Sequence, residues 1–99
     1  MDTDQVRTHA QAHADAVIRA DWDAVFGDFA PEVRPALVDA GPPPGMPERV
    51  TAAEVRRVAD ADAKAIVEIH YEGAESSVTV RSEWEDRDGR PMIVTVAPA

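Results

Sequence analysis

The chain has 99 residues, of which 19 are acidic and 10 basic, and its formal net charge is −9. This length predicts one domain with a small core, and a hydrophobic content of 44% is typical of a globular protein. The charge argues against nucleic acid and anionic membrane surfaces as partners, because both attract Lys and Arg. The lack of cysteine excludes disulfides and thiolate zinc sites.

The N-terminal segment lacks the features of a targeting sequence. It reads Met1-Asp2-Thr3-Asp4-Gln5, which is acidic and polar, unlike a secretory signal. No apolar run approaches the roughly 20 residues that span a bilayer. We therefore expect a soluble, cytoplasmic protein.

Residues 1–40 have the periodicity of a helical layer. A first helix is expected over about 4–20, because its apolar residues recur at steps of three and four. Asp21 can cap a second, short helix over 22–29. A further turn or two is expected over 32–40, with Pro35 in the first turn.

Residues 41–50 form a Pro-rich connection. They contain the run Gly41-Pro42-Pro43-Pro44-Gly45-Met46-Pro47, which cannot continue a helix. We expect this segment to cross the surface between the helical layer and a sheet.

Residues 51–99 are expected to form an antiparallel sheet. Three apolar runs alternate with period two, over 65–72, 77–85 and 92–96, so alternate side chains lie on opposite faces. Gly73-Ala74 can make the first turn between these runs. The expected fold is α+β, with N-terminal helices packed on a curved antiparallel sheet of three to four strands.

The hairpin at 86–90 allows two registers. A two-residue Asp88-Gly89 turn would set Trp84 opposite Ile93, whereas a three-residue bulged loop would set Trp84 opposite Met92. The second register places nearly all the large apolar residues on one face, so we predict the bulged loop, which leaves Ile93 on the outer face.

Residues 51–64 fit two structures. Thr51-Ala52-Ala53-Glu54 matches a helix capping box, which favours a helix. A strand over 54–59 would instead add a fourth member to the sheet.

The order of these elements resembles the nuclear-transport-factor-two-like superfamily. The resemblance rests on Ala-Asp-Trp-Asp-Ala-Val-Phe-Gly-Asp-Phe-Ala-Pro-Glu at 20–32 and Trp-Glu-Asp-Arg-Asp-Gly-Arg-Pro-Met-Ile at 84–93. It implies a cystatin-like α+β cone, with helices packed into a bent sheet around a pocket and a homodimer formed through the sheet. It also favours the strand at 54–59. The superfamily contains isomerases, cyclases and dehydratases as well as proteins without chemistry, so it does not settle the function.

Several ionisable groups are candidates for chemistry. His70 is expected outside the sheet with Glu68 and Glu72, as a surface residue. His9 and His13 lie four residues apart on the first helix, a spacing that can chelate a metal, but no third ligand accompanies them. Four carboxylates near the helix junction, Asp15, Asp21, Asp23 and Asp28, include a possible general base. We assign no catalytic residue, metal or cofactor.

Large apolar residues are the remaining candidates. Trp22, Phe26, Phe29, Tyr71, Trp84 and Met92 are most simply the core. Five of them are also candidates to line a ligand pocket: Trp22, Phe26, Tyr71, Trp84 and Met92. The sequence thus favours a non-catalytic domain that binds a small apolar ligand or assembles with itself. The alternatives are a small isomerase, cyclase or dehydratase for an apolar carbonyl compound, and a subunit that docks a protein on a sheet face bearing Ile66, Ile93 and Thr95.

Overall fold

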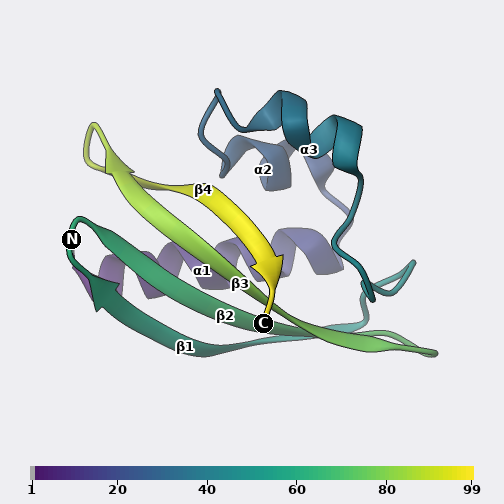
Figure 1. Cartoon of the computed structure of the whole chain (residues 1–99). Coiled ribbons are helices and arrows are strands. Elements are labelled where there is room, and N and C mark those ends of the chain that lie inside the picture. Colours follow the sequence, from purple (N-terminus) through teal and green to yellow (C-terminus); the bar gives the residue numbers. More distant parts are fainter. Residues whose placement is uncertain (1) are drawn as a thin grey trace.

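The computed structural model describes residues 2–99, and within them helices precede a single sheet (Figure 1). The elements are α1 (Thr3–Ile18), α2 (Trp22–Gly27), α3 (Arg34–Ala40), β1 (Ala52–Ala61), β2 (Lys64–Glu72), β3 (Ser77–Arg87) and β4 (Arg90–Pro98). The strands are antiparallel in the order β1-β2-β3-β4. The predicted α+β fold is confirmed, and 54–59 lies in a strand rather than a helix.

The helix α1 is stabilised by an N-terminal cap and by a buried face. The Asp2 carboxylate caps it by accepting a 2.9 Å hydrogen bond from the Asp4 backbone N–H. Its buried stripe, which packs against the sheet, consists of Val6, Ala10, His13, Ala14, Ala16 and Val17. The helix ends at Ile18, earlier than predicted, because Ala20 adopts a left-handed conformation (φ 55°) that turns the chain toward α2.

The helix α2 begins at Trp22 as predicted, whereas α3 begins at Arg34, two residues later than predicted. The Asp21 carboxylate caps α2 by accepting a hydrogen bond from the Ala24 N–H at 3.3 Å, and Pro35 lies in the first turn of α3. The helix α2 ends at Gly27, two residues before the predicted end. Phe29 instead forms an isolated parallel bridge with Ile93 of β4.

The inner face of the sheet carries the core. On β2 and β3 it presents Ala65, Val67, Ile69 and Tyr71 opposite Trp84, Ser82, Val80 and Val78. The placement of Tyr71 and Trp84 in the core is confirmed. Trp22 and Phe26 are not core residues, because 52% and 38% of their surfaces are exposed. Met92 is half-buried on the outer face, opposite Glu85.

The predicted register of the last hairpin is wrong. The turn is the two-residue Asp88-Gly89 type, with both residues at positive φ, and Trp84 lies opposite Ile93. The expected bulge occurs instead within β4, where Val94 is the extra residue between Ile93 and Thr95. The two-residue turn thus buries Ile93 in the core rather than on the outer face, and the bulge then sets Val96 opposite the buried Ser82.

The β2–β3 connection also differs from the prediction. Glu72 pairs with Ser77, so the loop has residues 73–76 rather than a Gly73-Ala74 turn. A methyl group on Gly73 would clash with Pro47 Cβ and would lie 2.7 Å from the Arg49 carbonyl oxygen. The glycine is therefore required because the Pro-rich connection passes directly over this loop.

We predict that Gly73→Ala lowers the free energy of unfolding by about 1–3 kcal/mol, because the Arg49 backbone must move. The matched control is Gly27→Ala in α2, where an added Cβ meets nothing within 4 Å. Alanine should be neutral or slightly stabilising there. Urea unfolding of both variants tests this, and equal effects would contradict it.

Candidate functional site

An ionic cluster joins α1, the end of α2 and β4; it is buried at His13 and Asp28, whereas Arg90 is 46% exposed. The two oxygens of the Asp28 carboxylate have different partners: Oδ2 lies 2.8 Å from His13 Nδ1, and Oδ1 accepts a 2.8 Å hydrogen bond from Arg90 Nη2. The side chains of His13 and Asp28 are only 8% and 13% exposed. Because a carboxylate only accepts hydrogen bonds, the pairing places the His13 proton on Nδ1.

Aromatic rings enclose the imidazole of this cluster. The His13 ring meets Phe29 and Trp84 edge-on, at centroid distances of 5.8 and 6.0 Å. The Trp84 indole N–H donates to Ser82 Oγ at 2.9 Å. Within residues 2–99, every fully buried side-chain nitrogen or oxygen has a partner. The side chains of Asp28, Trp84 and Ser82 are thus hydrogen-bonded to other parts of the chain.

Two arginines complete the end of α2. Arg90 donates to the Gly27 carbonyl at 3.1 Å, and Arg34 Nε lies 3.1 Å from both the Phe26 and the Phe29 carbonyl oxygens. Cations at the C-terminal end of a helix satisfy its free carbonyls and its dipole. Arg90 thus binds both the backbone and the carboxylate at the helix end.

Tyr71 lies on the same inner face, further along β2. Burial raises the pKa of its phenol far above the usual 10.0, and the negative charge of Asp28 raises it further. The phenol therefore stays protonated in the folded protein.

The structure separates the candidate histidines. His13 binds Asp28 and faces the core, whereas His9 lies a turn away on α1, half-buried. Residues 2–99 contain no group of three or more His, Asp or Glu side chains placed to hold a metal ion. His70 lies on the outer face, as expected, but its side chain is only 15% exposed.

The four carboxylates of the helix junction do not form one site. Asp28 is inside, Asp21 caps α2, and Asp15 and Asp23 are exposed. Sequence reasoning missed the link between His13 and Asp28. The only available signal was that a histidine occupied the apolar stripe of the first helix.

The pocket candidates also lie in three different places. Tyr71 and Trp84 are buried in the core, Trp22 and Phe26 are exposed on α2, and Met92 faces the other side of the sheet. The structure therefore does not bring the five side chains together around one space.

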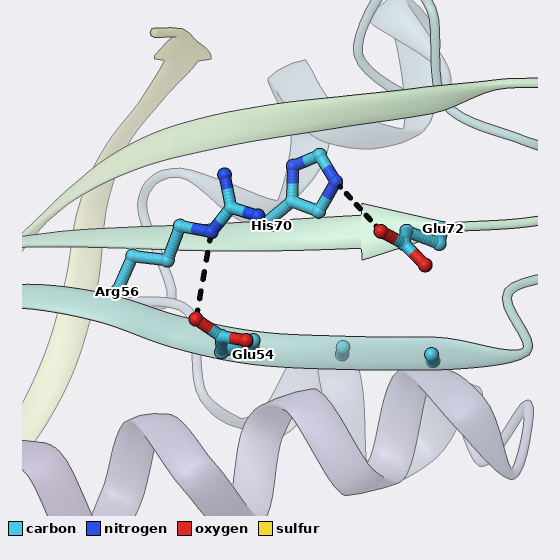
Figure 2. Close-up of a pocket in the computed structure, with 6 residues that line it drawn as sticks. Glu54, Arg56, His70 and Glu72 are labelled. Carbon is cyan, nitrogen blue, oxygen red and sulfur yellow. Dashed lines mark ion pairs between the residues drawn. The ribbon is translucent and has the colours of Figure 1, made fainter.

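A shallow hollow of about 130 Å³ lies on the outer face, over β1 and β2 (Figure 2). Figure 2 shows His70 paired with Glu72 and Arg56 paired with Glu54, at 3.3 and 3.6 Å. His70 Nδ1 also lies 2.9 Å from Thr79 Oγ1. Since its polar side chains contact one another, this hollow resembles the polar surface around it.

We predict that Asp28→Asn lowers the free energy of unfolding by about 2–3 kcal/mol, because it leaves His13 and Arg90 without their carboxylate. The control is Glu54→Gln, whose pair with Arg56 is exposed and should contribute less than about 0.5 kcal/mol. Urea denaturation of both variants measures the difference. Equal losses in the free energy of unfolding would show that the Asp28 pairings stabilise the fold no more than the exposed pair does.

A second prediction concerns pH. Tyr71 is the single tyrosine of the chain, and its raised pKa means that the unfolded state loses the phenol proton first. The contribution of Tyr71 to the free energy of unfolding is therefore fully present below about pH 10 and declines as the pH rises above it. Absorbance at the phenolate band should rise only as the fold is lost, and Tyr71→Phe should flatten the decline. Ionisation near pH 10 with the circular dichroism unchanged would contradict this.

No helix in residues 2–99 combines the length and apolar character needed to cross a membrane.

No protein-family model and no curated protein matches the chain. Solved structures that are similar to it include the following two. One is a SEC-C motif containing protein from Rhodopseudomonas palustris, with a TM-score of 0.65 and 15% identity, covering 92% of this chain and 76% of that chain.

The other structure is an NTF-2 like protein of unknown function from Burkholderia xenovorans LB400. Its TM-score is 0.61 at 20% identity, and the match covers 97% of this chain and 82% of that chain. At these identities the similarity concerns the fold alone. The chain has a nuclear-transport-factor-two-like fold.

Proposed function

We propose that this chain is a non-catalytic binding or assembly domain that acts through its surfaces. The observation that carries the proposal is the pairing of the Asp28 carboxylate, which lies between helices and sheet. Both Asp28 oxygens already accept a hydrogen bond, from His13 and Arg90, and the side chain is only 13% exposed. A general base must lie within hydrogen-bond reach of the substrate proton, and the partners of Asp28 occupy that position.

Packing of the inner face supports the same conclusion. Trp84 and Ile93 are almost fully buried between the helices and the sheet, and Tyr71 is 3% exposed. A small apolar ligand remains the second binding mode in this proposal. It would have to displace one of these side chains, because they occupy the space that a pocket in this fold would use.

For assembly we propose a homodimer formed through the outer face of the sheet. This face carries both signs of charge, with Arg57 paired to Glu68 and Lys64 paired to Glu83 at 3.7 and 3.9 Å. A two-fold dimer places the same face against itself. Alternating charges on one protomer can meet opposite charges on its partner across such an axis, which favours one relative position of the two sheets.

The arrangement of His13 favours one competing function, a small isomerase, cyclase or dehydratase. Its Nδ1 is held by Asp28, while no hydrogen bond to Nε2 occurs within residues 2–99. A carboxylate that orients an imidazole in this way is a known device of general bases. This alternative requires an opening beside the ring, which Phe29 and Trp84 now fill.

We predict that the protein does not accelerate proton abstraction from an apolar ketone. The assay follows hydrogen–deuterium exchange next to the carbonyl of cyclohexanone in D₂O by NMR, with His13→Gln as the matched variant. Equal rates for wild type, variant and buffer are expected. A wild-type acceleration that His13→Gln abolishes would establish the enzymatic alternative.

We also predict that Arg81→Glu disrupts the dimer. Arg81 is exposed near the middle of the outer face, opposite Glu68. A glutamate at this position should repel the negatively charged side chain that Arg81 meets on the other protomer of the proposed dimer. Sedimentation equilibrium should show a dimer for wild type and at least a roughly tenfold weaker dimer for the variant. The control is Arg7→Glu on α1, which should leave the association unchanged. A wild-type monomer at high concentration would refute dimerisation.

A further inference from the structure

One side of α2 presents large apolar side chains that the fold does not cover. Trp22 and Phe26 lie one helical turn apart, so they share a face of the helix. Ile18, at the end of α1 and 36% exposed, precedes them, and α1 packs against α2. We call Trp22 and Phe26, which share this face of α2, the aromatic patch.

The exposure of Trp22 is unusual because the chain buries comparable side chains elsewhere. Trp84, the other tryptophan, is completely buried, and Tyr71 and Phe29 are nearly so. Water contact with grouped aromatic and aliphatic surface is unfavourable, and such patches mark interaction sites. Tryptophan is also among the residues that contribute most to protein interfaces.

Unpaired carboxylates flank the aromatic patch. Asp21 and Asp23 are the chain neighbours of Trp22, and Asp15 lies one turn before Ile18 on α1. Within residues 2–99 none of the three is in an ion pair, whereas Asp28, Glu32 and Glu85 all bind arginines. Two basic residues also lie near the patch: Arg19 follows Ile18, and Arg34 donates to the Phe26 carbonyl at 3.1 Å. Neither is in an ion pair within the described chain, so the border carries three carboxylates and two guanidinium groups.

We propose that the aromatic patch docks a partner protein segment whose apolar anchors are flanked by Lys or Arg. Charge complementarity identifies this occupant, because such a segment supplies the cations that the three carboxylates lack. A second copy of the chain that presented the same patch would bring the carboxylates of the two patches together. An anionic lipid surface is opposed for the same reason.

This surface is separate from the proposed dimer face. The residues after α2 bond to Ile93 at the edge of β4, and α2 lies on the helical side of the sheet (Figure 1). Arg81 is on the opposite side. Variants of the two surfaces therefore test the two proposals independently, and one can fail while the other holds.

The probe is a fluorescein-labelled, 18-residue amphipathic peptide of Leu and Lys, and its partner is a peptide with Glu in place of Lys. Binding is followed by fluorescence anisotropy. Emission of Trp22 gives a positional signal, because Trp84 is already buried and should not respond. The Lys peptide should bind and shift the Trp22 emission to shorter wavelength. Its affinity should fall as the salt concentration rises.

Two sets of variants locate the binding. Trp22→Ala and Phe26→Ala should each lower the affinity for the Lys peptide by about 30-fold or more, which is the loss expected for an interface hot spot. Both side chains are exposed, so urea unfolding should show that the variants still fold. The double variant Asp15→Asn, Asp23→Asn should weaken binding several-fold and reduce its dependence on salt.

The charge control is Asp62→Asn, Asp88→Asn. Both residues lie in hairpin turns at φ 57°, where Asn is well tolerated, and this double variant changes the net charge equally. It should bind the Lys peptide like wild type.

Four outcomes would overturn the proposal. They are failure of the Lys peptide to bind, equal binding of the Glu peptide, an equal loss in the charge control, and self-association of the protein that Trp22→Ala abolishes. The last result would assign the patch to a second copy.

Discussion

The carboxylate of Asp28 is the interaction on which the arrangement of helices and sheet depends. It binds His13 of α1 and Arg90 of β4, and the backbone of the same segment bonds to Ile93. Three parts of the chain are thereby joined at one buried position. Because a buried carboxylate without partners is strongly unfavourable, alternative positions of α1 or β4 would leave a charge unsatisfied. The cluster thus selects one packing as well as stabilising it.

The same cluster limits what the interior can do. In this fold the space between helices and sheet can hold a ligand or a reacting group, but here it holds Trp84, Ile93 and the paired side chains of His13 and Asp28. Polar side chains that satisfy one another have little remaining capacity for a substrate. Functional capacity is then expected at the surface, where the outer sheet face and the aromatic patch differ in chemistry. The first is mixed in charge, whereas the second is apolar with a border richer in carboxylates than in guanidinium groups.

Sequence patterns identified those elements whose periodicity is local. The alternation in 65–72 predicted the inner face of β2, and Asp21 and Pro35 predicted how α2 and α3 begin. The last hairpin was misassigned because a bulge shifts the alternation by one residue, and no residue type marks its place. Exposure of Trp22 was also missed, because its spacing with Phe26 is the same for a covered face as for an uncovered one.

The amino-acid sequence by itself determined the class of fold, since the periods of 3.6 and 2 follow from backbone geometry and are visible in the order of the residues. It also determined the acidic character of the surface. Only the tertiary structure decided that His13, Asp28 and Arg90 meet, because they are 15 and 62 residues apart along the chain. Contacts over such separations depend on how whole elements pack, and packing also decided which aromatic side chains are covered.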